Sequence, residues 1–192
     1  LEAASYALAK KDNPALEKKV DSAISLLAQA QEKDGYLNTY YTITGKKRWS
    51  NLFENHELYT AGHFIEAAVA HYSATGKKTL LDLMVKFADL IAEVFGNGEK
   101  QLHGYPGHPE IELALVRLYK VTANKKYLDL AYFFVLERGK KPVYFETEET
   151  YRAKQFRIPG FNDFGLDYCQ AHLPIREQKT AEGHAVRALY LY

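Results

Sequence analysis

Histidines occur at three places where the sequence predicts the start of a helix. Two of them, His56 and His63, stand among glutamates in residues 54–67, ahead of an apolar helical pattern. His108 and His184 each follow a glycine and precede another apolar helical pattern. A fold that collects helix starts at one end of a ring would bring these imidazoles together into one site.

The spacing of the first pair argues against a metal site of the zinc-protease type. Those enzymes use histidines at i and i+4 with a glutamate between them. His56 and His63 are seven residues apart, which on a helix separates them by roughly 10 Å along the axis. A single histidine at a helix start most commonly has a structural role, but three such placements together favour a shared site.

Seven glutamates near these segments could supply the paired carboxylates of a glycosidase, but their spacing selects no pair. Most are interpreted as charges at helix starts, favoured by the helix dipole, or as solvated residues. The chain has one cysteine, Cys169, which excludes a disulfide framework and a thiolate metal cluster within the chain. A lone cysteine is more typical of a small buried apolar residue than of a nucleophile. The glutamates are Glu54, Glu57, Glu66, Glu110, Glu112, Glu177 and Glu182.

The bulk composition narrows the class of protein. With 192 residues and 47% hydrophobic content, the chain can form one domain with a substantial core. Its net charge of +1 offers no electrostatic attraction to nucleic acid or to an acidic membrane surface. No apolar run reaches the ~18 residues that would span a membrane. The 15 tyrosines suit a cleft for amphipathic ligands such as sugars, although most are expected to fill the core.

Apolar periodicity predicts an all-α chain. An aromatic stretch at 36–41 is expected to be extended, and residues 139–179 are expected to form a long irregular insert rich in aromatic residues. Helices are expected at residues 1–10, 14–32, 55–74, 78–95, 108–121 and 125–138, with a last helix from about residue 180.

An internal repeat indicates how these helices pair. The pattern from Tyr72 to Leu83 recurs from Tyr119 to Leu130, 119 − 72 = 47 residues later. A repeated helical hairpin of this length is typical of an α-solenoid or of a closed α/α toroid. Short turns alternate here with long loops ahead of the histidines, which favours a toroid with a cleft on its long-loop face.

Both ends of the chain fall within helical patterns, so we expect one partial α/α-barrel domain over residues 1–192, truncated at both ends. Half a toroid would expose apolar helix faces, and we therefore expect the isolated chain to form homodimers or aggregates. The single cysteine suits a cytoplasmic location.

The three histidine segments, with residues 34–40 and 172–178, resemble the β-L-arabinofuranosidases of glycoside hydrolase family 127. The resemblance implies a six-hairpin α/α barrel followed by β-sandwich domains that this chain lacks. It also implies a retaining hydrolase that removes terminal β-L-arabinofuranose from glycans or glycoconjugates. In that family histidines bind the sugar hydroxyls, and the motifs place this role at His56, His108 and His184, with His63 as a further candidate.

The family's chemistry uses a cysteine nucleophile held on zinc by further cysteines and a glutamate, with a second glutamate as acid/base. All of these residues lie C-terminal to the segment present here, so the resemblance implies no catalytic residue and no bound zinc in this chain. The chain alone is then expected to be inactive. Two alternatives remain open from the residues: another α/α-toroid carbohydrate enzyme, such as a sugar epimerase or an unsaturated-uronide hydrolase, and a non-catalytic α-solenoid that binds a protein.

Overall fold

The computed structural model describes residues 1–148 and 165–192, and this part of the chain is built from helices. An isolated parallel bridge joins Phe95 to Leu102. The prediction of an all-α chain is confirmed. The α-helices are α1 (Glu2–Lys10), α2 (Pro14–Ala30), α3 (Thr39–Thr44), α4 (Glu57–Thr75), α5 (Thr79–Val94), α6 (Ile111–Thr122), α7 (Lys125–Glu137) and α9 (Ala185–Leu191), and the 3-10 helices are η1 (Tyr144–Thr147), η2 (Leu166–Cys169) and η3 (Ile175–Glu177).

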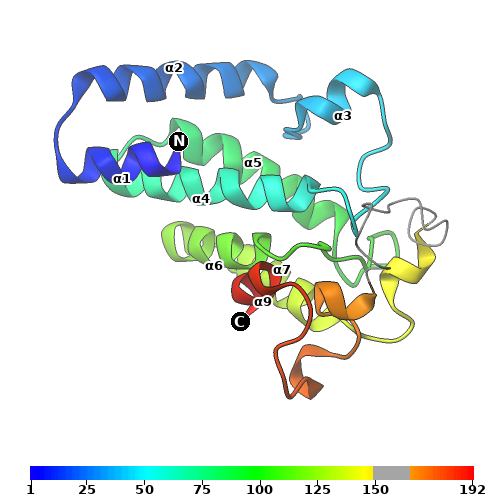
Figure 1. Ribbon diagram of the computed structural model, residues 1–192. Coiled ribbons are helices and arrows are strands. Elements are labelled where there is room, and N and C mark those ends of the chain that lie inside the picture. Colours follow the sequence, from blue (N-terminus) through cyan, green and yellow to red (C-terminus); the bar gives the residue numbers. More distant parts are fainter. Residues whose placement is uncertain (149–164) are drawn as a thin grey trace, which may run out of the picture.

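Helix α4 is the centre of the arrangement and packs against α1, α5 and α6, while α6 packs against α7 (Figure 1). Its side chains are buried on more than one face, from Leu58 and Ala61 to Ile65 and Ala68. Such burial is expected of a helix surrounded by other helices rather than lying at a surface.

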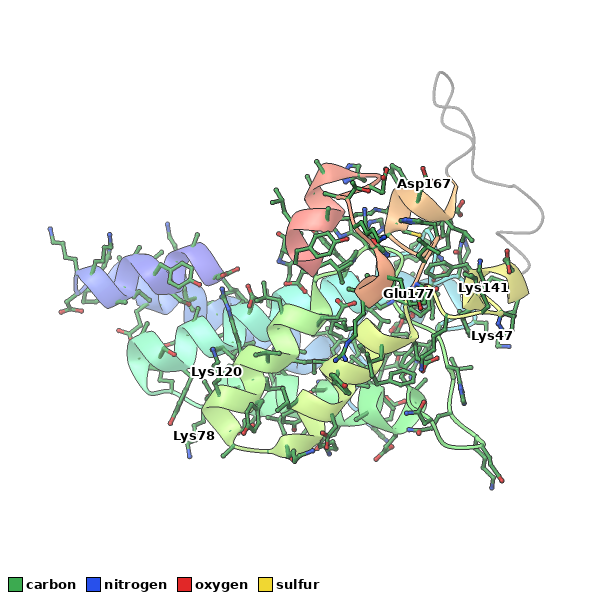
Figure 2. All side chains as sticks on the ribbon, turned by 90° about the horizontal axis from the view of Figure 1, so that it is seen from below. Lys47, Lys78, Lys120, Lys141, Asp167 and Glu177 are labelled. Atoms are coloured by element: carbon green, nitrogen blue, oxygen red, sulfur yellow. The ribbon has the colours of Figure 1, made fainter. Side chains whose placement is uncertain are left out.

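The connections divide the bundle into two ends (Figure 1). The short links α1–α2, α4–α5 and α6–α7 lie at one end, which we call the turn end. The long connections ahead of α4, α6 and α9 lie at the other, which we call the loop end. In Figure 2, Lys78 and Lys120 mark the turn end, and Lys47 and Lys141 mark the loop end. The predicted division between tight turns and long loops is confirmed.

The predicted repeat appears as two matching hairpin turns. Gly76 closes α4 and Ala123 closes α6, both in the left-handed conformation, with φ of 71° and 57°. The backbone N–H of Gly76 donates to the carbonyl of Tyr72 at 2.8 Å, and that of Ala123 donates to Tyr119 at 2.7 Å. The same turn is therefore built twice, once with glycine and once with alanine.

Three predictions, one about the type of an element and two about where helices begin, are wrong. The aromatic stretch at 36–41 is extended only in part, because residues 39–41 belong to helix α3, whose backbone groups are paired within the helix. Helix α6 begins at Ile111 rather than at residue 108, and Pro109 disfavours helical backbone at His108. The last helix begins at Ala185, after Gly183 has adopted a φ of 73°.

The predicted insert at 139–179 is more regular than expected at both of its ends. It carries η1 near its start, and η2 and η3 in residues 165–179. Its aromatic-rich middle, residues 149–164, lies outside the described residues. Of these short helical turns, η2 lies beside α9 (Figure 1), where the ring of Tyr168 meets that of His184.

Some apolar side chains remain exposed on the helices. Leu26 of α2 is 66% exposed, Ile43 of α3 is 82% exposed and Leu189 of α9 is 82% exposed. Among the described helices, none combines the length and the apolar character needed to cross a membrane.

Candidate functional site

All four histidines predicted from the sequence meet at the loop end. The ring of His108 lies 5.9 Å from His56 and 6.2 Å from His184, measured between centroids. His63 joins them through Tyr59, whose ring is 4.5 Å from both His63 and His108. We call these four imidazoles and the tyrosines between them the histidine cluster.

Three tyrosines complete the cluster, and none of them was singled out from the sequence. Tyr190 of α9 faces His108 at 5.7 Å and His63 at 6.1 Å, and Tyr168 of η2 faces His184 at 5.3 Å. For Tyr59 a sequence signal existed, because it stands three residues after His56, the N-cap of α4, and four before His63, a spacing that places the three residues on one side of the helix start. Tyr168 and Tyr190 reach the cluster through tertiary packing alone.

A cavity of about 430 Å³ opens beside His56. Helix α3 supplies Tyr40 and Tyr41 to its wall, and α4 supplies Phe64. The amide of Asn55 donates to the hydroxyl of Tyr41 at 2.6 Å, which fixes one side of this cavity next to His56. Space lined by aromatic rings and a few polar groups thus adjoins the histidine cluster.

The loop before α6 is fixed against the loop before α4, and this contact brings His56 and His108 together. The N–H of Gly107 donates to the carbonyl of Leu52 at 2.8 Å. A Cβ at position 107 would lie 2.0 Å from the carbonyl oxygen of Phe53, so the approach requires glycine. The carboxylate of Glu148 accepts hydrogen bonds from the N–H groups of Leu52 (2.6 Å) and Phe53 (3.2 Å).

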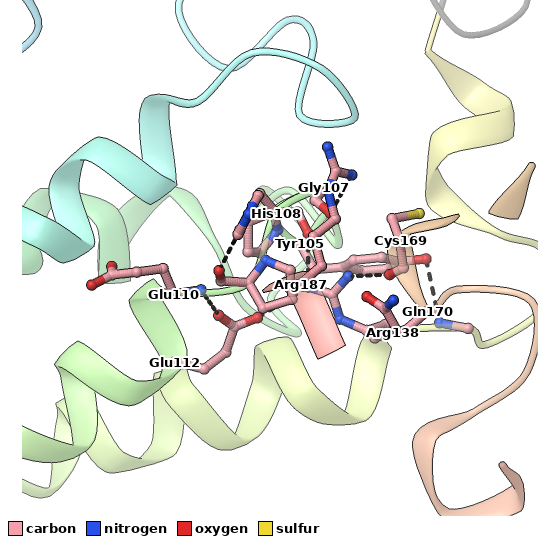
Figure 3. Close-up of polar contacts among 12 residues, drawn as sticks. Tyr105, Gly107, His108, Glu110, Glu112, Arg138, Cys169, Gln170 and Arg187 are labelled. Atoms are coloured by element: carbon pink, nitrogen blue, oxygen red, sulfur yellow. Dashed lines mark hydrogen bonds and ion pairs between the residues drawn. The ribbon is translucent and has the colours of Figure 1, made fainter. Parts of the chain in front are cut away.

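The fully buried guanidinium of Arg138 lies near the loop that carries His108 (Figure 3). Arg138 donates to the carbonyl of Cys169 at 2.8 Å and to the carbonyl of Pro106 at 2.7 Å, and it pairs with Glu112 at 3.1 Å. The other carboxylate oxygen of Glu112 accepts the N–H of Glu110 at 3.0 Å. This network ties the loop before α6 to α7 and η2, so that His108 has a rigid support.

A second arginine fixes the position of α9. Arg187 donates to the carbonyl of Gly107 at 3.0 Å, and its guanidinium lies 4.4 Å from the centre of the Tyr168 ring. His184 caps the same helix, because its Nδ1 accepts the N–H of Arg187 at 3.4 Å. The guanidinium therefore adds a positive charge close to the imidazoles.

Burial and the nearby charge of Arg187 favour the neutral form of the His108 and His56 imidazoles. The pKa of His108 is lowered to about 4, chiefly by burial and also by the charge of Arg187, while the hydrogen bond with the Pro109 carbonyl acts in the opposite direction. Burial, followed by Arg187, also lowers the pKa of His56. A neutral imidazole has one donor nitrogen and one acceptor nitrogen, which is the arrangement needed to bind a hydroxyl group.

Hydrogen bonds to the backbone show which ring nitrogen is the donor and which is the acceptor in His108 and His184. Nδ1 of His108 lies 2.7 Å from the carbonyl oxygen of Pro109, which can only accept, so Nδ1 carries the proton and Nε2 is an acceptor. Nδ1 of His184 accepts a backbone N–H, so in the neutral ring Nε2 carries the proton and is a donor. Neighbouring rings thus offer opposite functions to a ligand.

Glu57 and Glu112 stand in the first turns of α4 and α6, as predicted for charges at helix starts, but these two, Glu66 and Glu110 are all buried and none of the four is solvated. Glu57, Glu66, Glu110 and Glu112 are between 0% and 6% exposed. Glu57 accepts hydrogen bonds from the Tyr36 hydroxyl at 2.5 Å and from the Trp49 N–H at 2.8 Å. These carboxylates connect helices and loops, and their burial depends on residues far away in the sequence.

Cys169 behaves as a buried apolar residue. It is 0% exposed, burial raises the pKa of its thiol to about 11, and the thiol donates to the carbonyl of Leu166 at 3.4 Å. A zinc ligand or nucleophile has to be a thiolate, so this thiol fits neither role. Within residues 1–148 and 165–192, no group of three or more histidine, cysteine or acidic side chains is arranged to hold a metal ion.

Comparison with known proteins gives a family match over the whole chain. The family model described as beta-L-arabinofuranosidase, GH127 catalytic domain, matches residues 1–192. A curated non-reducing end beta-L-arabinofuranosidase from Bifidobacterium longum subsp. longum is 42% identical over 203 residues. That alignment covers 100% of this chain and 30% of the relative.

Solved structures show the same relationship. A GH127 β-L-arabinofuranosidase from Geobacillus stearothermophilus T6 is 56% identical with a TM-score of 0.92, and the match covers 100% of this chain and 30% of that one. A second GH127 β-arabinofuranosidase is 43% identical with a TM-score of 0.84, over 100% of this chain and 28% of that one. The helices described above are those of the family's α/α barrel, and the chain spans less than a third of each relative.

Proposed function

The chain belongs to the GH127 β-L-arabinofuranosidase family, and from this membership we propose that it forms the N-terminal part of the catalytic barrel of an enzyme that releases terminal β-L-arabinofuranose. We use the term complete enzyme for the longer protein proposed to contain it. Family membership favours a glycosidase over the epimerase, uronide-hydrolase and solenoid alternatives.

The single observation that carries this proposal is the opposite hydrogen-bonding roles of two neighbouring imidazoles. His108 offers an acceptor and His184 offers a donor, with the two rings 6.2 Å apart. Hydroxyls of a sugar ring both donate and accept, and the rings of Tyr59 and Tyr190 provide apolar surface for its C–H groups. We propose that His56, His108 and His184, with His63, bind the hydroxyls of the arabinose.

We propose that the nucleophile, the acid/base carboxylate and the zinc ligands come from the part of the complete enzyme that follows this chain. The buried thiol of Cys169 and the scattered carboxylates of the described residues do not fit that metal site. A bound zinc would hold a cysteine of that part in its thiolate form, the form that can act as the nucleophile of a retaining reaction. The contribution of this chain is then binding and orientation, which lower the barrier without replacing the nucleophile.

The exposed apolar side chains support a partial barrel. Leu26, Ile43 and Leu189 lie on helices of the bundle and are each more than half exposed. We propose that later helices of the same polypeptide cover these faces in the complete enzyme. In the isolated chain, the same faces would drive formation of homodimers or aggregates.

The test is hydrolysis of an aryl β-L-arabinofuranoside by the complete enzyme and its variants. His56→Ala and His108→Ala each remove a neutral hydrogen bond to the substrate, and we expect kcat/KM to fall by roughly 10- to 100-fold. His103→Ala, an exposed histidine away from the cluster, is the control and should leave kcat/KM unchanged. Unchanged activity in both cluster variants would contradict the proposal.

Two further measurements test whether the nucleophile lies outside this chain and whether the reaction retains the anomeric configuration. The isolated chain should release no L-arabinose, and measurable release would show that the nucleophile lies within it. Proton NMR of the product formed in the first turnovers should show the β anomer, as a retaining reaction requires.

A further inference from the structure

Glu110, the residue that precedes α6, has an unusual environment. Its side chain is 0% exposed, and both carboxyl oxygens lack a hydrogen bond within the described structure. A buried polar group without a partner is costly and commonly marks a functional role. Figure 3 shows that the side chain extends away from the Arg138–Glu112 pair instead of joining it.

Gly62 leaves a notch in the surface of α4, and the carboxyl group of Glu110 occupies it. A Cβ at Gly62 would lie 1.4 Å from Oε2 of Glu110 and 2.9 Å from the Cα of Ile111, so a larger residue at position 62 would occupy the same space. Oε1 of Glu110 lies 3.5 Å from Nδ1 of His63, the next residue along α4. The buried carboxyl group thus lies against Nδ1 of an imidazole of the histidine cluster whose side chain is 39% exposed.

The groups around Glu110 favour its neutral form. Burial, followed by the charges of Glu66 and Glu112, raises the pKa of this carboxyl group to about 9, while Arg117 acts in the opposite direction. Arg117 is itself engaged by Glu66, with its Nε 3.1 Å from Oε1. The titratable and charged groups that face Glu110 are Glu2 of α1, Tyr59, His63 and Glu66 of α4, and Glu112 and Arg117 of α6.

We propose that Glu110 is a positioning residue for sugar binding: as a neutral acid it donates its proton to Nδ1 of His63 and fixes the tautomer of that ring. His63 then carries its own proton on Nε2 and acts as a hydrogen-bond donor in the cluster. This inference rests on the proposed function, since it assigns a role to one of the proposed sugar ligands. The separation of 3.5 Å has to shorten by about 0.5 Å, as hydrogen bonds at such sites commonly do when substrate binds.

The variants separate proton donation from packing. Glu110→Gln keeps the shape and an N–H donor at all pH values, whereas Glu110→Leu keeps bulk without a donor. In the complete enzyme at pH 6, we expect KM for an aryl β-L-arabinofuranoside within about twofold of wild type for Glu110→Gln, and about tenfold higher for Glu110→Leu. We expect kcat to change less than KM in both variants.

The dependence of KM on pH gives a second test, which does not use Glu110→Leu. Ionisation of Glu110 removes its donor proton, so the KM of the wild-type enzyme should rise as the pH passes about 9. Glu110→Gln should lack this rise, because an amide does not ionise. If both proteins share the same alkaline profile, the inference is overturned, and this holds even if Glu110→Leu does not fold.

A double-mutant cycle connects the effect to His63. If Glu110 acts through His63, Glu110→Leu should add nothing to the KM of His63→Ala. Additive effects would overturn the inference and leave the proposed function intact, since His56→Ala in the same assay tests that function separately. If the wild-type complete enzyme releases no L-arabinose, both fall together.

Discussion

The hairpin turns at the turn end and the buried glutamates at the loop end obtain their hydrogen bonds differently. At the turn end, Gly76 and Ala123 close two hairpins in the same left-handed conformation and with the same kind of backbone hydrogen bond. In both turns the backbone N–H of the closing residue is satisfied by a carbonyl four positions earlier in the sequence. Turns of this kind stabilise the fold locally and make no demand on distant residues.

At the loop end, two buried glutamates at the starts of neighbouring helices have different surroundings. Glu57 accepts hydrogen bonds from Tyr36 and Trp49, whereas Glu110 accepts none among the described residues. The first glutamate therefore has a structural role. The second is left unsatisfied beside a cluster of imidazoles, which is expected where a protein gives up stability for function.

Substitution of the buried arginine should have the largest effect. Arg138→Met removes three hydrogen bonds and leaves Glu112 buried without its cation, so we expect the free energy of unfolding of the complete enzyme to fall by about 3–5 kcal/mol. Chemical denaturation measures this change. Arg176→Met, at an exposed arginine of the loop end, is the matched control. A difference below about 1 kcal/mol between the two variants would refute the view that the loop end depends on buried charge.

Filling the notch in α4 should have the next largest effect. Gly62→Ala places a methyl group where the Glu110 carboxyl lies, so we expect a loss of about 1–3 kcal/mol despite the better helix propensity of alanine. Ser73→Ala, an exposed change on the same helix, should stay within about 0.5 kcal/mol. The double variant Gly62→Ala/Glu110→Ala should recover part of the loss, and no recovery would show that the clash lies elsewhere.

The unsatisfied carboxyl should also make stability depend on pH. The pKa of Glu110 is raised to about 9 in the fold, from about 4.3 in an unfolded chain. The folded state therefore binds more protons between these values, and its stability falls as pH rises through them. Relative to wild type, Glu110→Gln should gain more than about 1 kcal/mol between pH 5 and pH 9, as measured by urea unfolding at both pH values. Glu177→Gln controls for the loss of one exposed carboxylate.

Exchanging the two turn residues should have the smallest effects, of opposite sign. Gly76→Ala forces a side chain into the left-handed region, which costs about 1 kcal/mol although no atom lies within 4 Å of the new Cβ. Ala123→Gly relieves the same strain, and the greater freedom of glycine in the unfolded chain limits the gain to a few tenths of a kcal/mol. Melting temperatures should move in opposite directions, and equal signs would show that the two turns are not equivalent.

Much of this architecture is visible in the sequence, because the signals that set it are local. Asn13 caps α2 by accepting the N–H of Leu16, as the Asn-Pro pair predicts, and apolar periodicity locates the longer helices within two or three residues. The repeat predicts both hairpin turns. The placement of four histidines ahead of or within the first turns of helices is enough to predict that they meet at the loop end.

Tertiary structure decides the protonation and the partners of those histidines. Tyr190 reaches the cluster from the far end of the chain, and Glu110 is buried because Gly62, on another helix, leaves room for it. The low pKa of His108 follows from burial and from Arg187. A carboxylate or an imidazole has the same sequence signature whether it is solvated or buried. Its charge is set by the groups that the fold places around it, and these come from elements distant in the sequence.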